Sequence, residues 1–279
     1  MTSTNTQTYR GQDINDPAFA LDTNVPQTLA GRLAIVTGCS RGIGLEITLT
    51  LASHGCRILG TYHNTPPTRL SELLGDKFSA VQIDIRTPAP AVSSIISSLQ
   101  EKYPGIPVDI LVNNAGVSTL GPLSTLSGDS MAAVFNGNTI FPALLTQSLL
   151  PFFNKEGRGR IINISSEASH LGRANTTVYS ASKAALESMT RTWAKELGQE
   201  YNGMTVNALA LGIMETHLFE QLPKERQTFW REKARETPVA PRVGQGKDVG
   251  PVVAFLASDA AGWVSGQVIS VSGGNMMVV

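Results

Sequence analysis

The chain has 279 residues, 42% of them hydrophobic, and its 22 basic and 22 acidic side chains leave a formal net charge of zero. This length suits one large α/β domain or two small ones and can bury a substantial core. The neutral balance gives no electrostatic reason to expect nucleic acid or an anionic membrane as a partner.

The amino-terminal segment, residues 1–30, is polar and lacks hydrophobic periodicity, so we expect a flexible arm there. It has no apolar signal core, and no window of the chain approaches the roughly 20 apolar residues that span a bilayer. The two cysteines, Cys39 and Cys56, are too few for a disulfide framework and lack zinc-ligand spacing, so no metal site is expected. These features favour a cytoplasmic protein.

From Arg32 onward, short apolar runs alternate with helical patterns, which is typical of βαβ units around a buried parallel sheet. No Pro-, Gly- or Ser-rich linker interrupts them, so residues 31–279 are expected to form one doubly wound α/β domain. The seven expected strands lie near residues 33–37, 57–61, 79–84, 109–113, 160–164, 204–209 and 267–271. Long helices are expected over about 129–154 and 178–200.

The first expected strand ends in the glycine-rich turn TGCSRGIG, Thr37 to Gly44, and a helix follows directly. Glycine lacks a Cβ, so the backbone can approach phosphates, and the N–H groups of the helix face negative charge. A tight turn without a ligand would use the same glycines. Placement between the first strand and a helix favours a dinucleotide site.

The spacing of Gly38, Gly42 and Gly44 resembles that of the short-chain dehydrogenase/reductase family rather than the tighter G-x-G-x-x-G form. The resemblance covers about residues 30–275 and implies a single-domain Rossmann fold, hydride chemistry with a nicotinamide cofactor, and a homo-oligomer, either a tetramer or a dimer. The motifs that carry it in family order are NNAG at 113–116, YSASK at 179–183, VNALALG at 206–212 and GQVISVSGG at 266–274.

The segment after the second expected strand, Tyr62–His63–Asn64, has no carboxylate where an acidic residue would bind the adenine ribose of NAD. Ser40 and Arg41 add a hydroxyl donor and a fixed positive charge that can bind a 2′-phosphate. NADP(H) is therefore the expected cofactor. His63 has an alternative interpretation as a solvated loop residue.

The resemblance implies further cofactor contacts along the chain. Asp84, at the expected end of the third strand, resembles the aspartate that bonds the adenine amino group, although an ordinary strand-end acid would look the same. Asn113 would stabilise the central sheet. The expected cofactor-binding residues are Gly38, Ser40, Arg41, Gly42, Ile43, Gly44, Tyr62, His63, Asn64, Asp84, Ile85, Asn114, Ala115, Gly116, Tyr179, Lys183, Gly212, Ile213 and Thr216.

Tyr179 and Lys183 are four residues apart, so a helix places them on one face, one turn apart. A phenol with a pKa of about 10 is a poor acid–base group at neutral pH, and a nearby ammonium is expected to lower that pKa. This pairing suits the general acid of a ketone reduction. The Y-x-x-x-K spacing is weak evidence alone and gains weight downstream of a cofactor turn.

The resemblance implies two further catalytic residues. The serine thirteen residues before the tyrosine is Ser166, which would bind the substrate carbonyl, while Ser165 would point the opposite way because side chains alternate along a strand. Asn138, rather than Asn136, matches the catalytic asparagine of the family. Gly137 is unfavourable inside a helix and suggests a local irregularity, which in the family frees a carbonyl for a water linking asparagine to lysine.

Two positions depart from the family pattern: Leu211 replaces a proline before Gly212, and Ser272 stands where an aspartate is common. Residues 212–238 are expected to form a variable, fairly apolar lid over the substrate, with Met214, His217, Leu218, Phe219 and Trp230. Glu167, His170 and Leu171 are expected to face the same pocket. Pocket-shaping roles for His170 and His217 are favoured over acid–base roles.

The sequence therefore predicts an NADPH-dependent reduction of a ketone to a secondary alcohol, on a medium-sized hydrophobic or acyl/polyketide-like substrate. One alternative is an NAD(P)-dependent alcohol dehydrogenase that works in the oxidative direction. Another is a cofactor-binding scaffold without turnover. The complete set Asn138, Ser166, Tyr179 and Lys183 argues against the scaffold.

Overall fold

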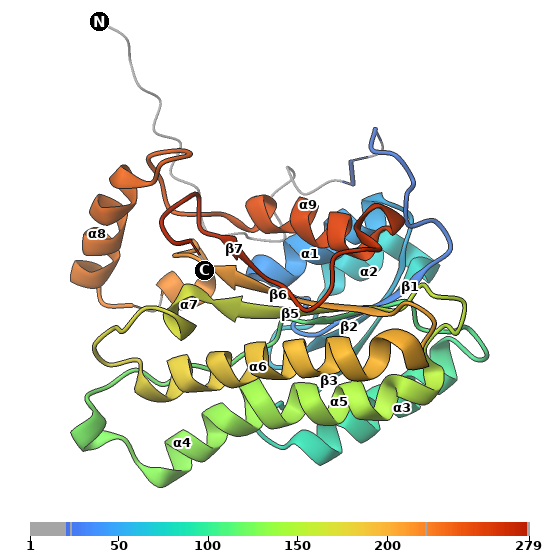
Figure 1. Cartoon of the computed structure of the whole chain (residues 1–279), viewed down its shortest axis with the longest axis horizontal. Helices are drawn as coiled ribbons and strands as arrows, with labels where there is room; N and C mark the ends of the chain where they lie inside the picture. The colour runs from blue at the N-terminus through green and yellow to red at the C-terminus, as the bar shows by residue number, and fades with distance from the viewer. Residues whose placement is uncertain (1–20, 23, 221, 278–279) are drawn as a thin grey trace, which may run out of the picture.

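The protein is built around a seven-stranded parallel sheet with the strand order β3-β2-β1-β4-β5-β6-β7 (Figure 1). A computed structural model describes residues 21–22, 24–220 and 222–277, apart from the side chains of residues 217 and 218. The strands are β1 (Leu33–Val36), β2 (Arg57–Tyr62), β3 (Phe78–Gln82), β4 (Ile110–Asn113), β5 (Arg160–Ser166), β6 (Thr205–Leu211) and β7 (Val268–Val271). The expected α/β fold is confirmed, with strand ends shifted by one or two residues.

Helices cover both faces of the sheet (Figure 1). On one face α1 (Gly42–Ser53) packs against α9 (Gly246–Ala257). On the other lie α3 (Pro88–Lys102), α5 (Phe141–Leu149) and α6 (Thr177–Glu200). The remaining helices are α2 (Thr68–Leu74), α4 (Gly128–Phe135), α7 (His217–Glu220) and α8 (Lys224–Lys233), with short helical turns η1 (Gly75–Lys77), η2 (Leu123–Thr125), η4 (Leu150–Phe152), η5 (Glu167–Ser169), η6 (Ala234–Glu236) and η7 (Asp259–Ala261), and the π-helix η3 (Asn136–Ile140).

Because every strand is parallel and each is followed by a crossover, all seven carboxyl ends meet at one edge of the sheet. The strand order reverses between β1 and β4, which places a crevice for ligands between their ends. The lid helices α7 and α8 lie at the same edge, beyond the arrowheads of β5 and β6 (Figure 1).

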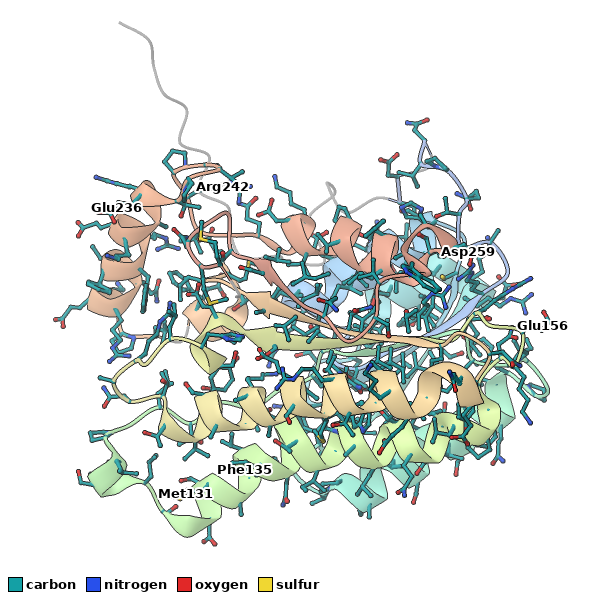
Figure 2. All side chains as sticks on the ribbon, viewed as in Figure 1. Met131, Phe135, Glu156, Glu236, Arg242 and Asp259 are labelled. Atoms are coloured by element: carbon teal, nitrogen blue, oxygen red, sulfur yellow. The ribbon has the colours of Figure 1, made fainter. Side chains whose placement is uncertain are left out.

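Ion pairs join chain segments at the opposite edge of the sheet, where the strands begin. Asp259 accepts a hydrogen bond from Arg32 at 2.6 Å and lies 3.6 Å from Arg160, and both guanidiniums are buried. Figure 2 shows that Asp259 lies far from Glu236 and Arg242, which are both at the lid end of the molecule.

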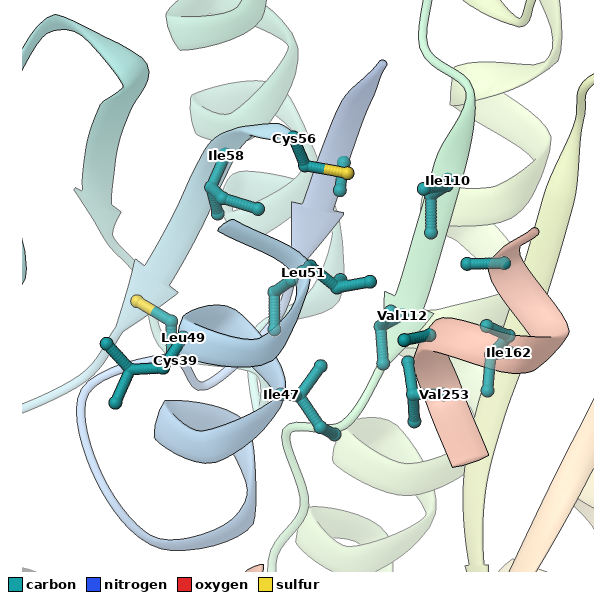
Figure 3. Close-up of a cluster of buried hydrophobic side chains, with 14 of the residues drawn as sticks. Cys39, Ile47, Leu49, Leu51, Cys56, Ile58, Ile110, Val112, Ile162 and Val253 are labelled. Atoms are coloured by element: carbon teal, nitrogen blue, oxygen red, sulfur yellow. The ribbon is translucent and has the colours of Figure 1, made fainter. Parts of the chain in front are cut away.

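The apolar core between the sheet, α1 and α9 contains both cysteines (Figure 3). Ile47 and Leu51 of α1 and Val253 of α9 are fully buried there. A Cβ on Gly60 would lie 2.4 Å from the Sγ of Cys39, so the glycine in β2 makes the room that this thiol fills. Burial raises the pKa of each thiol to about 12.

The described part of the expected amino-terminal arm is packed rather than free. Leu29 is fully buried, and its N–H donates to the carbonyl of His54 at 3.0 Å. The Nε2 of Gln27 donates to the carbonyl of Ser53 at 2.6 Å. Residues 24–30 thus lie against the end of α1, which corrects the arm boundary at residue 30, while residues 1–20 and 23 lie outside the described residues. Within the described part of the chain, no helix is both long and apolar enough to cross a bilayer.

Candidate active site

The turn between β1 and α1 depends on its glycines in two ways. Gly38 and Gly42 have φ values of +72° and +57°, which favour glycine. A Cβ on Gly44 would lie 2.0 Å from the carbonyl oxygen of Gly38 and 2.5 Å from the Nδ2 of Asn114. That amide nitrogen donates to the carbonyls of Thr37 and Gly38, at 2.8 and 3.2 Å, and so fastens the turn to the end of β4.

The start of α1 has the features of an anion site. Its N-cap residue, Arg41, makes no side-chain capping bond, and the first turn holds no acidic residue. The first N–H groups of the helix are therefore left to an outside acceptor. Close backbone packing at Gly44 and uncapped helix donors together fit the diphosphate of a dinucleotide cofactor.

The adenine end of this crevice carries more positive than negative charge. Arg41, His63 and Asn64 are exposed, and Ser40 is mostly buried. Asp84 lies two residues beyond β3 rather than at its end, which corrects the expected position. Hydrogen bonds from Arg86, at 2.7 to 3.0 Å, lower the pKa of Asp84 and offset its charge.

The other expected cofactor residues line the rest of the crevice. The N–H of Ala115 donates to Thr37 Oγ1 at 3.0 Å, which orients the segment after β4. On the lid side, the side chain of Thr216 lies 3.9 Å from the position of a Cβ on Gly42, so residues 174 positions apart in the chain face each other across the turn. Gly212 and Ile213 follow β6 directly and are half-buried, and Ile85 is buried.

Tyr179 and Lys183 lie one turn apart at the start of α6, as expected. The Nζ of Lys183 donates to the carbonyl of Ile164 at 2.8 Å and lies 5.9 Å from the centroid of the Tyr179 ring. Ser166 ends β5, and its Oγ accepts from the N–H of Ala168 at 3.2 Å. The Ser166 side chain also acts on the Tyr179 hydroxyl as a hydrogen-bonding neighbour that lowers the tyrosine pKa.

The pKa of Tyr179 differs from the expectation. Burial raises it, and the hydrogen bond with Ser166 only partly opposes that effect. Burial also lowers the pKa of Lys183 to about 8, against the opposing effect of Glu187. The prediction that Lys183 lowers the pKa of Tyr179 was therefore wrong for this structure. Lys183 is directed to a backbone carbonyl, and burial disfavours the charged form of both side chains.

The helix irregularity expected near Gly137 is the π-helix η3. Asn138 is fully buried within it, with its Nδ2 donating to the carbonyl of Val117 at 2.8 Å and to Ser182 Oγ at 3.0 Å. A Cβ on Gly137 would lie 2.9 Å from Val117, so packing calls for glycine here. The alternative, Asn136, instead donates to the carbonyl of Arg86 at 3.3 Å.

Gly116 marks where these groups converge. The position of a Cβ on Gly116 is 3.4 Å from Asn138 Oδ1 and 3.5 Å from Lys183 Nζ. The glycine therefore leaves a narrow space between the asparagine and the lysine. Ser166 also acts on the Tyr179 hydroxyl, so the structure brings the four side chains expected to be catalytic into one region.

Two charged residues near these side chains, Glu187 and Arg173, make contacts that the sequence analysis did not predict. Glu187, one turn beyond Lys183, is buried and accepts a 2.6 Å hydrogen bond from Ser165, whose side chain turns to α6. Arg173 forms an ion pair with Glu167, which is itself buried. The position of Glu187 four residues after Lys183 could have indicated its role, because an i+4 spacing places both side chains on one helix face. The pairing of Arg173 with Glu167 could not be predicted in this way, because it depends on the path of a loop.

A pocket of about 720 Å³ lies between the lid and β7. Among the described residues, Leu171, Met214 and Trp230 give it apolar walls, but neither Tyr179 nor Ser166 lines it. The charged side chains of its wall are Glu167, Arg173, Lys233, Glu236, Arg242 and Asp248. Four of these six charged residues come from outside the expected lid, and Glu167 reaches the pocket as part of an ion pair rather than as a free acid. The side chains of His217 and Leu218 lie outside the described residues, and no group of acidic, His or Cys residues in the described part could hold a metal ion.

Comparison with known proteins gives consistent matches over most of the chain. Residues 38–275 match the family model described as enoyl-(acyl carrier protein) reductase. The short-chain dehydrogenase/reductase FrzI of a Cladobotryum species is 39% identical, over 91% of this chain and 100% of FrzI. The 3-oxoacyl-[acyl-carrier-protein] reductase FabG of Thermotoga maritima is 34% identical, over 88% of this chain and 98% of FabG.

Two solved structures share the fold. A blue fluorescent protein from a metagenomic library, in complex with NADPH, superposes with a TM-score of 0.79 and 33% identity, covering 90% of this chain and 100% of that one. The angucycline C-6 ketoreductase LanV, with bound NADP, has a TM-score of 0.79 and 30% identity, covering 88% and 96%.

Proposed function

We propose, because this chain belongs to the short-chain dehydrogenase/reductase family, that it reduces a ketone to a secondary alcohol with NADPH. The observation that carries the proposal is that Tyr179 lies one helical turn from Lys183, whose Nζ is 5.9 Å from the tyrosine ring, at the carboxyl edge of the sheet. Ser166 acts on the same tyrosine hydroxyl. Relatives named as 3-oxoacyl reductases and a ketoreductase support the reductive direction.

The glycine turn and the uncapped start of α1 would hold the cofactor diphosphate, with Ser40 and Arg41 nearest to a 2′-phosphate. The structural neighbours in complex with NADPH and NADP support this choice of cofactor. When bound, the cofactor supplies the hydride. The protein supplies placement, charge and the proton.

Tyr179 is the proton donor in this proposal. Tyr179 is protonated at neutral pH, so it holds a proton for the carbonyl oxygen. Because burial makes the phenol a weaker acid, release of that proton would depend on stabilisation of the phenolate by the nearby Lys183 ammonium. The Ser166 hydroxyl would bond the same oxygen as negative charge develops on it. Lys183 contributes positive charge next to the phenol, and Asn138 fixes the Val117 segment that borders the space left by Gly116.

The pocket beside the lid, which Glu167 next to Ser166 lines, would hold the apolar body of a medium-sized substrate of the acyl or polyketide type, with the reacting carbonyl outside the pocket at Ser166 and Tyr179. The six charged side chains of its wall form three ion pairs with one another, so its apolar residues carry this inference. An alcohol dehydrogenase working in the oxidative direction would use the same residues, and the assay below separates the two.

We further propose a cytoplasmic homo-oligomer, a tetramer or dimer. Trp263 is fully exposed and Phe255 is about half exposed, both near β7, which supports burial of this region in an oligomer. Both cysteines are unpaired and buried, as suits a reducing compartment. Light scattering of the purified protein tests the assembly.

The direct test follows NADPH absorbance with a panel of ketones, and NADP⁺ with the matching alcohols. We expect Tyr179→Phe to lower kcat by about 100-fold or more while NADPH affinity stays within about threefold. Tyr201→Phe, at the far end of α6, is the matched control. Full turnover by Tyr179→Phe would overturn the mechanism, and NADPH binding with no turnover in either direction would favour the scaffold.

A further inference from the structure

Glu187 is a buried acid that the mechanism above does not use. Its side chain is 4% exposed, and it lies four residues after Lys183 on α6, so the two side chains leave the same face of the helix. Lys183 is buried to the same degree. A buried ammonium and a buried carboxylate one turn apart each reduce the cost of holding the other without water.

The carboxylate of Glu187 is fully engaged by the segment that carries the candidate serine. Its Oε1 accepts from Ser165 Oγ and Ser169 Oγ, both at 2.6 Å. Its Oε2 lies 2.9 Å from the Nε2 of His170, which is partly exposed. Glu187 therefore holds residues on both sides of Ser166, through contacts before and after it in the chain.

We propose that Glu187 is a positioning residue: it keeps Lys183 protonated and anchors the Ser165–His170 segment on which Ser166 is held. The proposal rests on the function proposed above, because it concerns the same lysine and serine. It assigns Glu187 no contact with substrate or cofactor.

The surroundings leave Glu187 as the main carboxylate acting on Lys183. From α6 itself, Tyr179 and Lys183 face the cluster, and from the segment after β5, His170 does. The other elements packed on α6 add little ionisable charge there. β6 and η3 hold no ionisable side chain, Arg160 of β5 points to the opposite sheet edge, Asp129 of α4 is exposed, and Glu167 of η5 is paired with Arg173.

The test measures NADPH affinity by fluorescence between about pH 5.5 and pH 9.5, without any ketone. The pKa of Lys183 is about 8 and Glu187 raises it, so wild-type affinity should fall with a midpoint near that pH. In Glu187→Gln the midpoint should move down by about one pH unit, the effect of losing a nearby opposite charge. The control Glu200→Gln, exposed at the end of α6, should leave the midpoint in place.

A second background separates charge from structure. In Lys183→Met the pH-dependent step should disappear, and adding Glu187→Gln should then produce no further shift. An unchanged midpoint in Glu187→Gln, or a shift that persists without Lys183, would overturn the proposal. Failure of the wild-type protein to bind NADPH at pH 7 would instead refute the proposed function.

Stability provides an independent arm if Glu187→Gln folds but is too unstable for the binding measurements at high pH. Removing one partner leaves a buried charge uncompensated, whereas removing both leaves none. We therefore expect the double variant Lys183→Met/Glu187→Gln to fold and to have a higher urea midpoint than Glu187→Gln. A double variant no more stable than the single one would contradict charge compensation.

Discussion

The guanidinium carbon of Arg173 lies 4.6 Å from the centroid of the Trp230 ring, and the same guanidinium pairs with the buried carboxylate of Glu167. Arg173 thus connects the residue next to Ser166 with lid helix α8. Arginine suits this position because its planar group can stack on a ring and bind a carboxylate at once.

We expect Arg173→Ala to lower the free energy of unfolding by about 2 kcal/mol, because it leaves the buried Glu167 carboxylate unpaired. KM for a good ketone substrate should rise more than kcat falls, since the lid loses its attachment. Arg173→Lys keeps the charge without the planar group and should recover only part of the loss. Urea unfolding and steady-state kinetics measure both effects, with Arg191→Ala, exposed on α6, as the control. Equal behaviour of the Ala and control variants would refute the connection.

Arg41 should determine the choice between the two nicotinamide cofactors. Loss of a charge-assisted hydrogen bond to a 2′-phosphate in Arg41→Ala should raise the Kd for NADPH by about 10- to 100-fold. The Kd for NADH should change by less than about threefold, because NADH lacks that phosphate. Isothermal titration with both cofactors measures the ratio. A parallel loss of affinity for both would place Arg41 at the diphosphate instead.

Gly44→Ala should disrupt the turn between β1 and α1. The added methyl would lie 2.0 Å from a backbone carbonyl oxygen, so the backbone must shift. We expect a loss of about 1–3 kcal/mol in the free energy of unfolding and at least a tenfold weaker NADPH affinity. Gly128→Ala is the control, since nothing lies within 4 Å of its added Cβ. Wild-type NADPH affinity in Gly44→Ala would show that the turn does not approach the cofactor.

The buried thiols give a pH-dependent prediction. Their pKa of about 12 in the folded protein is above the unfolded value of 9.0, so the folded state binds more protons between these two values. Their contribution to stability is therefore complete below pH 9 and decreases as the pH rises towards 12. At pH 8 Ellman's reagent should react with neither Cys39 nor Cys56 in the native protein and with both in denaturant. Rapid reaction of a native thiol would contradict the burial.

The sheet was predictable because each βαβ unit has a local pattern, apolar strand followed by amphipathic helix, and because parallel strands bring their carboxyl ends together. The placement of Tyr179 next to Lys183 was predictable for the same reason, because a single helix fixes the distance between them. Even the irregularity at Gly137 had a local cause in helix propensity.

What the sequence did not show depends on contacts between distant segments. The tyrosine pKa follows from burial by the whole fold, and no spacing rule reports that. Glu187 contacts three side chains from the end of β5 and the segment after it, 17 to 22 positions earlier in the chain. Arg173 contacts Trp230 only because the lid folds back over the loop. These relations require the path of the chain in space.

The π-helix η3 sets a limit on how this protein can be altered. An α-helical residue turns the chain by about 100°, so deleting one residue from η3 to obtain a regular helix would rotate everything on one side of it by that angle. Either Asn138 would leave the site or α5 would turn its buried side chains, such as Phe141 and Leu145, away from the sheet. The irregular turn therefore gives the register that places both Asn138 and the buried side chains of α5, and a redesign that makes this helix regular would lose one of the two placements.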